Sequence, residues 1–469
     1  MGLSAYAPAA LAGGLYFSER GVRPLGRGGA FTAGADDLGA IWHNPAGIYD
    51  AGSSLLLDAS LMLYETDYQR EALVEQSNPN SKEPVARYLR TYPQVTGTSA
   101  LLPLPTLAGS YKVHRRVVLA AGALAPYGAI TSFPEKIDGE PAPQRYSLIT
   151  LDGSALVLAG LWGAFAPTDE WRFGLGVDAL LGKFVATTMF GACLPDRFFC
   201  APEQPDWDAL VQLSAGPLFA PSGNAGVQWI PHERWRLGAS FHLPLWVRAP
   251  ATFTARLPVA PVFETAYQEG EDAHVAFELP WRLGLGVQWR PLDALRVELA
   301  GQYEGWSIHD AIRITPENAK LRGLVGLPDP YPLSPQSIPR GFQDSVAVRL
   351  GGEHDLELWS QKWQVRAGAS FESSAVPPEY LSALTVDVPK LTLGLGLGWT
   401  RGGLRLDAVY AHIFGFDVAV DPQEAQIPML NPVQANQPPA GHYVNGGDYG
   451  AHADVVGLGV SYQFAGPEA

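Results

Sequence analysis

The stretch KLTLGLGLGWT, residues 390–400, alternates two very different kinds of side chain. One face carries only bulky apolar groups: Leu391, Leu393, Leu395, Leu397 and Trp399. The opposite face carries only small ones: Thr392, Gly394, Gly396, Gly398 and Thr400. Because successive side chains of an extended chain point to opposite faces, this alternation predicts a β-strand. In a soluble sheet the bulky face would meet a core, whereas in a membrane barrel it would meet lipid.

The same alternation recurs along the chain, for example in WRFGLGVDALL (171–181) and WRLGLGVQWRP (281–291). We count fourteen such runs. Their approximate ranges are 53–66, 106–113, 117–128, 148–165, 171–190, 212–230, 234–256, 274–290, 295–314, 344–355, 362–374, 390–400, 404–418 and 452–464. The sequence therefore predicts an all-β protein with an even number of strands.

Short and long connections alternate between these runs. HRR, PTDE, PHER, PLDA and RGG are tight turns, whereas 67–105, 315–343 and 419–451 are long and rich in Pro, Asn and Asp. Strict alternation places all turns at one end of the strands and all loops at the other. Outer-membrane barrels have this asymmetry, with short periplasmic turns and long external loops.

The tryptophans give an independent indication of the same fold. Six of them fall beside the short turns: Trp171, Trp229, Trp235, Trp289, Trp363 and Trp399. Aromatic rings of this kind suit the boundary between lipid and water, because one end is apolar and the other can form hydrogen bonds. A soluble protein has no reason to align them at one level.

Composition narrows the class of protein. No run approaches 18 uninterrupted apolar residues, so transmembrane helices are not expected. A soluble β-propeller would show a repeat of about 40–50 residues, and we find none. The net charge of −15 offers no basic surface for nucleic acid.

Two features bear on the cellular compartment. Residues 1–14, MGLSAYAPAALAGG, end in small residues typical of a signal-peptidase site, and we interpret them as a leader or the remainder of one; an uncleaved flexible leader is the alternative. Cys193 and Cys200 stand in one loop, CLPDRFFC. A small disulfide in an oxidising compartment is the favoured interpretation, and two unpaired thiols are the alternative.

A fourteen-stranded barrel with Gly and Thr on its inner face would be hollow unless something filled it. Residues 15–52 precede the first strand and are compact and rich in turns, so we expect them to plug the barrel that residues 53–469 form. Within them, RGVRPLGRGGAFTAGADDLGAIWHNPAGI resembles the N-terminal hatch of the FadL/TodX family of outer-membrane transporters for hydrophobic compounds. The matching positions are Gly26, Gly28, Gly29, Asp36, Asp37, Asn44, Pro45 and Ala46.

The resemblance implies a fourteen-stranded antiparallel transmembrane barrel with a hatch in the bacterial outer membrane. It further implies passive uptake of long-chain fatty acids or aromatic hydrocarbons, with lateral exit into the bilayer at a kink in the third strand. That strand ends in APYG, residues 125–128. Pro126 lacks the N–H that a central strand requires, and Gly122, Tyr127 and Gly128 lie beside it, so these four residues are gate candidates; an ordinary strand end is the alternative.

Several further side chains have expected roles. Asn44-Pro45-Ala46 would fasten the hatch, with Asn44 bonded to the barrel wall and Pro45 fixing the turn; a plain Asn-Pro turn is the alternative. Asp36 and Asp37 would pair with inward arginines, Arg172, Arg236, Arg366 or Arg405, or else cap a helix. The fourth run is apolar on both faces, so Leu156, Leu158 and Trp162 would line an apolar pocket or pack against the hatch.

Catalytic and cofactor motifs are not found. The sequence has no G-x-S-x-G, H-E-x-x-H or Walker A pattern, and GLGLG (394–398) lies within a strand rather than before a helix. We expect no enzyme activity, cofactor or metal, and a monomer whose partners are a hydrophobic ligand and outer-membrane lipid. A water-filled diffusion porin is the alternative function, and a lipid-modifying enzyme of the outer membrane is a more distant one.

Overall fold

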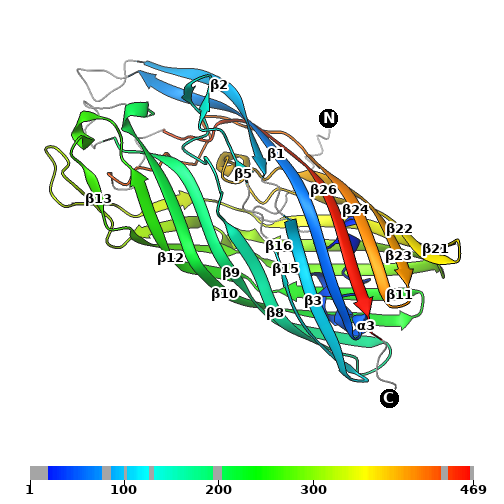
Figure 1. The fold of residues 1–469 in the computed structure, drawn as a ribbon. Helices are drawn as coiled ribbons and strands as arrows, with labels where there is room; N and C mark the ends of the chain where they lie inside the picture. Colours follow the sequence, from blue (N-terminus) through cyan, green and yellow to red (C-terminus); the bar gives the residue numbers. More distant parts are fainter. Residues whose placement is uncertain are drawn as a thin grey trace, which may run out of the picture.

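A computed structural model describes residues 20–76, 86–99, 103–125, 131–193, 203–434 and 442–464. Its main element is a closed antiparallel barrel of fourteen strands, as the sequence predicts (Figure 1). The first strand, β1 (Ser54–Gln76), pairs with the last, β26 (Gly447–Gln463), from Ser54↔Gln463 to Arg70↔Gly447. This pairing closes the cylinder by joining its first and last strands.

The other barrel strands follow in chain order. They are β3 (Pro103–His114), β4 (Val117–Leu124), β8 (Ala155–Phe165), β9 (Trp171–Gly191), β10 (Asp208–His232), β11 with β12 (Trp235–His242, Leu245–Arg256), β14 with β15 (Asp272–Leu279, Trp281–Leu292), β16 with β17 (Leu295–Gly305, Ala311–Pro316), β21 (Ser345–Leu358), β22 (Gln361–Glu372), β23 (Lys390–Arg401) and β24 (Leu404–Gly415). Three strands predicted as continuous are therefore each divided in two. Pro244 and Pro280 stand at two of the three breaks, where a proline cannot donate to the ladder.

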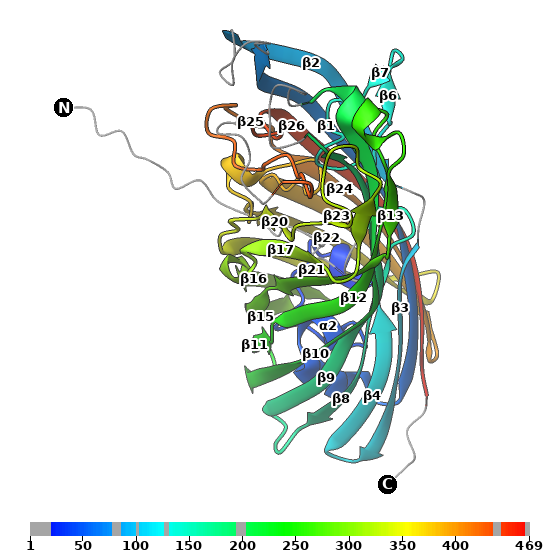
Figure 2. The same cartoon turned by 90° about the vertical axis from the view of Figure 1, so that its left-hand side faces the viewer.

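One predicted loop is largely strand. The range 67–105 was expected to be irregular, yet β1 continues to Gln76 and β2 (Ala86–Ser99) pairs with its distal half. Polar residues on both faces obscured this hairpin in the sequence, because it projects beyond the barrel rather than crossing it (Figures 1 and 2). The alternation rule detects a strand with one apolar face and misses a strand that carries polar side chains on both faces, even though Tyr68 and Arg70 on one face of this hairpin are buried.

Several short strands lie at the loop-bearing end of the barrel. They are β5 (Thr131–Ser132), β6 (Lys136–Ile137), β7 (Glu140–Pro141), β13 (Tyr267–Glu269), β18 (Lys320–Arg322), β19 (Tyr331–Pro332), β20 (Gln336–Pro339) and β25 (Val418–Val420). Single-turn helices η2 (Pro205–Trp207), η3 (Pro261–Phe263), η4 (Trp306–Ile308) and η5 (Pro378–Tyr380) lie in the connections. None of the helices in the described part of the chain is long and apolar enough to cross a membrane.

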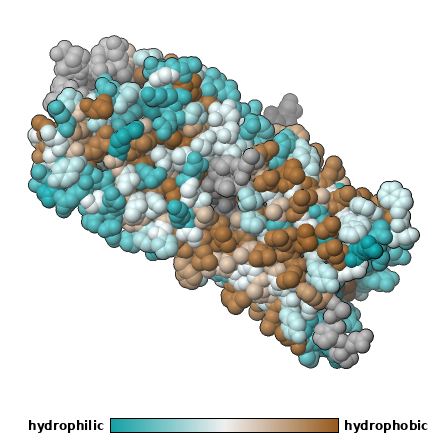
Figure 3. All heavy atoms as spheres, viewed as in Figure 1, coloured by the Kyte–Doolittle hydropathy of each residue, from teal (hydrophilic) through white to brown (hydrophobic). Residues whose placement is uncertain are grey.

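The bulky faces of the strands point outward. Leu393, Leu395 and Leu397 of β23 are 45–62% exposed, and Leu458 of β26 is 68% exposed. Figure 3 shows the resulting apolar surface over the barrel, with more polar surface toward its two ends. Apolar exposure on this scale would be unfavourable in water and suits the hydrocarbon region of a membrane.

The six tryptophans beside the short turns form three cross-strand pairs. Trp171 faces Trp229, Trp235 faces Trp289 and Trp363 faces Trp399 in the strand register. The first two pairs are stacked, with ring centroids 5.5 and 6.0 Å apart. They form the aromatic girdle that the sequence predicts at the turn-bearing end.

The N-terminal segment, residues 20–52, lies inside the cylinder (Figure 2). It contains α1 (Val22–Leu25), α2 (Ala40–His43), η1 (Pro45–Gly47) and α3 (Ile48–Ala51), joined by turns. Most of its residues are buried and none is fully exposed. Its contacts reach β8, β9 and β10 on one side and β23, β24 and β26 on the other, so it spans the lumen.

The small faces of the strands are explained by this segment. A Cβ on Gly174 of β9 would lie 2.2 Å from the carbonyl carbon of Pro45, and one on Gly394 of β23 would lie 2.1 Å from the carbonyl oxygen of Leu25. Such distances leave no room for any side chain. The glycines therefore face inward because the backbone of the N-terminal segment lies directly against the wall.

Candidate functional site

The N-terminal segment is fastened to the wall by a buried carboxylate. Glu298 of β16 is fully buried and accepts the backbone N–H groups of Thr32, Ala33 and Gly34 at 2.7, 2.8 and 2.9 Å. Arg27 of the segment adds an ion pair at 3.0 Å. Three consecutive N–H groups aimed at one point form an anion-binding concavity, which here holds a side chain of the barrel itself.

A second buried carboxylate gathers four arginines. Glu353 of β21 lies 2.8 Å from Arg23 and 3.7 Å from Arg27 of the segment, and it also contacts the wall residues Arg296 and Arg366. A buried charge is costly unless it is paired and hydrogen-bonded, and this cluster meets that condition. The segment and the wall are thus joined by charges that neither could bury alone.

Asp36 and Asp37 bond arginine, but not the arginines expected. Both contact Arg23 within the segment, and Asp36 also pairs with Arg296 of β16 at 2.8 Å. Burial alone would raise the pKa of Asp36, but Arg23 and Arg296 outweigh it and hold that pKa well below its usual range. The carboxylate is therefore ionised at any physiological pH.

The four arginines that we expected to meet Asp36 and Asp37 pair elsewhere. Arg172 and Arg236 hold Asp50 of the segment at 2.9 and 3.0 Å. Arg366 and Arg405 meet Asp407 of β24 at 2.7 and 2.9 Å. All four point inward near the short turns as expected; the choice of partner depends on how the segment docks.

Asn44, Pro45 and Ala46 form a turn that is bonded to the wall. Asn44 Nδ2 donates to the carbonyl oxygens of Thr32 and Val227 at 2.8 and 3.2 Å, and its Oδ1 accepts the N–H of Ala46. Pro45 begins η1. Asn44 thereby joins two parts of the segment to β10.

The glycines of the hatch-like motif serve close approach. Gly28 and Gly29 have φ of +58° and +75°, which L side chains rarely adopt. A Cβ on Gly28 would also lie 2.5 Å from the backbone nitrogen of Ala369. Gly26 lies against Gly396 of the GLGLG stretch: a Cβ added to Gly26 would lie 3.1 Å from the Cα of Gly396.

Glu298 and Glu353 were missed in the sequence. Their signal was available: in LRVELAG (295–301) and RLGGEH (349–354), a charge falls on the small, inward face of an apolar strand. A carboxylate at such a position needs a partner inside the barrel. Which partner it meets could not be read from the pattern.

The lumen changes character toward the loop-bearing end. There the inward faces of β10, β12 and β14 carry apolar side chains only, buried and in mutual contact: Val211, Leu213, Leu245, Val247, Ala249, Phe253, Val275 and Phe277. We call this surface the apolar wall. Its side chains carry no charge and no hydrogen-bonding group, so the surface suits apolar molecules of many shapes.

The three pocket candidates of the fourth barrel strand point inward. Leu158 and Trp162 of β8 are buried in the main apolar cluster, and Leu156 packs partly buried against it. Trp162 Nε1 donates to Asn224 Oδ1 at 3.1 Å, and Asn224 in turn donates to the carbonyl oxygen of Ile41 in the segment. Trp162 is thus linked to the N-terminal segment through Asn224.

The gate candidates lie where β4 stops. This strand has 8 residues, against 25 in β10. Its pairing with β8 ends at Leu124↔Leu158, and among the described residues positions 155–157 of β8 pair with β9 alone. Gly122 lies within the paired part, whereas Pro126, Tyr127 and Gly128 lie outside the described residues.

A small cavity adjoins this strand end from inside. Leu104 and Pro105 of β3, Ala125, Met62 of β1 and Leu25 of the segment are among its lining residues. The Ala125 N–H donates to the Pro105 carbonyl at 3.2 Å, the last described bond before the strand ends. The cavity thus lies between the N-terminal segment and the point where the pairing of β4 with β8 ends.

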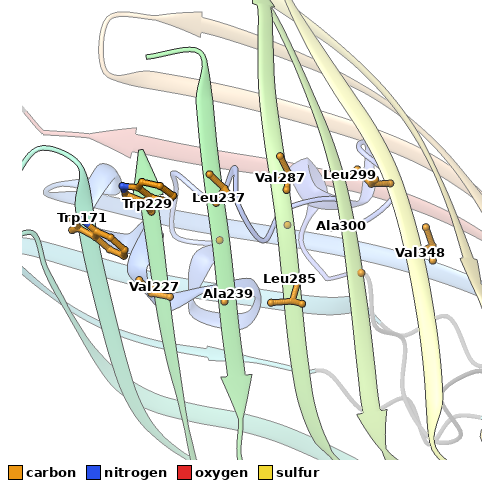
Figure 4. A pocket seen from close by; sticks show the side chains of 13 residues that line it. Trp171, Val227, Trp229, Leu237, Ala239, Leu285, Val287, Leu299, Ala300 and Val348 are labelled. Atoms are coloured by element: carbon orange, nitrogen blue, oxygen red, sulfur yellow. The ribbon is translucent and has the colours of Figure 1, made fainter. Parts of the chain in front are cut away.

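A larger groove lies on the outer face of the barrel and is separate from the lumen. Figure 4 shows Trp171, Trp229, Leu237, Leu285, Leu299 and Val348 around it, on successive strands. Ala239 and Gly301 leave it hollow because they are small. Its lining side chains are outward-facing, so it belongs to the apolar belt.

Two remaining predictions concern sulfur and metal. Cys193 is buried, and its carbonyl oxygen accepts hydrogen bonds from Asn431 and Gln434 at 2.8 and 2.6 Å; Cys200 lies outside the described residues, so the disulfide stays a prediction. Within the described ranges no three His, Cys, Asp or Glu side chains are grouped as metal ligands.

Comparison with known proteins relates this architecture to a family. The family model for outer membrane protein transport proteins (OMPP1/FadL/TodX) matches residues 3–464. Among curated proteins no relative matches by sequence.

Solved structures of transporters share the fold. A Pseudomonas aeruginosa FadL homologue has a TM-score of 0.68 at 15% identity, covering 97% of this chain and 100% of that one. The Pseudomonas putida toluene transporter TodX gives 0.62 at 14%, covering 95% and 99%, and the Ralstonia pickettii toluene transporter TbuX gives 0.58 at 16%, covering 96% and 99%. The barrel thus lies in the bacterial outer membrane, and the chain belongs to the OMPP1/FadL/TodX family of outer-membrane transport proteins for hydrophobic compounds.

Proposed function

We propose that this protein takes up hydrophobic molecules passively from outside the cell and releases them sideways into the outer membrane beside β4. In this proposal residues 15–52 are a hatch that stays in place, and residues 53–469 form the barrel. The observation that carries the proposal is the combination of an apolar outer lumen, a lumen blocked by residues 20–52, and the short β4 at one side. Together they leave the side wall as the route out.

Transfer energetics support lateral release. Moving each CH₂ from water to an apolar surface gains about 0.8 kcal/mol, so a ten-carbon chain gains about 8 kcal/mol. Release into an aqueous periplasm would forfeit that gain, whereas release into lipid would not. No energy source is then required.

The first test is chemical. The protein is purified in mild detergent, and co-purified lipids or hydrocarbons are identified by mass spectrometry. We expect single-chain amphiphiles or hydrocarbons. Recovery of no apolar compound, together with rapid swelling of proteoliposomes in sugars, would support a diffusion porin instead.

The second test concerns the gate. In P126V the wall regains a backbone N–H at the end of β4, so uptake should fall while heat-modifiable barrel assembly is unchanged. P221V is the matched control, since Pro221 lies in the long ladder of β10. Normal uptake by P126V would remove the gate from this position.

A further inference from the structure

The groove on the outer face of the barrel is a hollow in an otherwise bulky belt. It has a volume of about 610 Å³ and crosses the strands from Trp171 of β9 to Val348 of β21 (Figure 4). Ala239 and Gly301 make the hollow: each faces the larger Leu285 in the strand register, and a Cβ added to Gly301 would have no neighbour nearer than 3.9 Å. The groove therefore has room for an apolar chain beside the wall.

The two ends of the groove lie at different depths in the membrane. Trp171 and Trp229 line one end, and they are a stacked pair of the aromatic girdle. At the other end, Val348 is eight residues away from Leu356, the residue that faces the girdle residue Trp363. Because the strands of a membrane barrel are tilted, a path that crosses them in register also changes depth. The groove thus leads from the boundary with water into the apolar belt, which is the course of a lipid acyl chain.

Charged side chains of both signs border the girdle end of the groove. Asp169 and Glu170 lie in the turn before β9, and Glu233 and Arg234 lie in the turn between β10 and β11. The two turns are neighbours, since the Ile230 N–H donates to the carbonyl oxygen of Glu170 at 2.8 Å. All four charged side chains are exposed, and none forms an ion pair with another described residue. They are free to bind a group at the membrane surface.

A second arginine lies beside Arg234. The N–H of Arg290, near the end of β15, donates to the carbonyl oxygen of Arg234 at 2.8 Å. The Nε of Arg290 is buried and has no acceptor within the described part of the chain. Buried donors in native proteins nearly always have a partner, and arginines at a membrane surface favour the phosphate of a lipid. The same strand carries Leu285 and Val287 of the groove, so the cation and the apolar surface belong to one site.

We propose that the groove binds an ethanolamine phospholipid of the inner leaflet, with one acyl chain in the groove and the head group on the adjacent turns. Arg234 and Arg290 would hold the phosphate, and Asp169 and Glu170 would accept hydrogen bonds from the ammonium group. Neighbouring strands lie about 4.8 Å apart, so long side chains from adjacent turns can reach one head group. The short turns of such a barrel face the periplasm, which places the site in the inner leaflet.

Charge complementarity selects this lipid among other occupants. A hydrocarbon would fill the groove but leave every charge at its girdle end without a partner. A phospholipid with an anionic head group would satisfy the arginines and be repelled by Asp169 and Glu170. A choline head group carries a cation without an N–H donor, so it could not form hydrogen bonds with these carboxylates. The site lies outside the lumen, and its occupation is independent of the uptake proposed above.

The test compares phospholipids with identical acyl chains. The purified protein in mild detergent is titrated with phosphatidylethanolamine, phosphatidylglycerol or phosphatidylcholine, and bound lipid is counted by native mass spectrometry. Because exposed ion pairs are weak, the wild type should prefer the ethanolamine lipid by about 2- to 5-fold. In A239L the larger side chain replaces the contacts of the acyl chain, so retention should fall by about 5-fold or more. A367L is the matched control, since Ala367 is exposed on β22 and does not line the groove.

Head-group variants test the second half of the proposal. D169N combined with E170Q should abolish the preference for the ethanolamine lipid over the choline lipid, whereas R234Q should weaken binding of all three lipids. Heat-modifiability on gels should stay normal in every variant, because the changed side chains face outward or lie in turns. Equal lipid retention by A239L and A367L would overturn the proposal, and so would equal binding of the three lipids to the wild type. A wild-type dimer that A239L converts to a monomer would instead assign the groove to a second copy of the chain.

Discussion

The two ends of the lumen are built on different principles. At the turn-bearing end, glycines bring the wall against the backbone of the N-terminal segment, and Glu298 and Glu353 hold it by charge-assisted hydrogen bonds. At the loop-bearing end, the wall presents apolar side chains without polar contacts. One cylinder thus combines a specific clamp with an unspecific surface.

This difference reflects what each region has to hold. A clamp on one fixed segment benefits from directional bonds, because each is satisfied by a single geometry. A surface for passing ligands benefits from area-dependent attraction, which tolerates many shapes and positions.

A larger side chain where the wall touches residues 20–52 should have the largest effect on ion conductance. We call this contact of the wall with the N-terminal segment the clamp. In G174V the new side chain would meet the Pro45 backbone, 2.2 Å from its added Cβ, so the segment must leave the wall. The barrel should then conduct ions in planar bilayers at a porin-like level, as an unfilled barrel of this width would. G301V is the control, because a Cβ at Gly301 has no neighbour nearer than 3.9 Å; equal conductance of the two variants would contradict the clamp.

Breaking the clamp by charge should have a somewhat smaller effect. E298A leaves Arg27 and three backbone N–H groups without their acceptor, which should cost about 3–5 kcal/mol in the docking of the segment. Hydrogen exchange of residues 30–35 should accelerate, and conductance should appear intermittently. E298Q keeps one acceptor oxygen and should lie between E298A and wild type; identical exchange in all three would show that Glu298 is dispensable.

A change in the apolar wall should affect uptake alone. V247T keeps the shape of a fully buried side chain and adds a hydroxyl, at a cost of about 1–3 kcal/mol for the unpaired group. We expect slower uptake of hydrophobic substrate and no change in conductance. Conductance in V247T like that of G174V would mean that the two regions are not separable.

Acid should loosen the loops at the loop-bearing end, and we expect this effect to be the smallest of the four. Burial alone would raise the pKa of Glu203, but Arg70 and His442 outweigh it and hold that pKa well below its usual range; Arg70 Nη1 donates to Glu203 at 2.7 Å. A depressed pKa stabilises the fold above the unfolded value of about 4.3, and this contribution fades as pH falls below it. Protease resistance of the loops should therefore hold at pH 5 and decline under pH 4, while E203Q should be sensitive already at pH 7.

Much of the fold could be predicted because membrane strands have a strong local pattern. Period-two alternation located all fourteen strands, and the tryptophans beside short turns identified the turn-bearing end. The β1–β2 hairpin escaped because both of its faces are polar. The breaks at 243–244, 280 and 306–310 escaped because alternation continues on either side of them.

The candidate site was less predictable, since its bonds join residues far apart in the chain. The sequence by itself determined that the strands face lipid and that small inward residues require a plug, because both follow from the nature of neighbouring side chains. Only the tertiary structure decided that Glu298 receives residues 32–34 and that Asp50 rather than Asp36 meets Arg172. Such pairings depend on barrel register and on the docking of the segment, and a shift of one residue in either would exchange every partner.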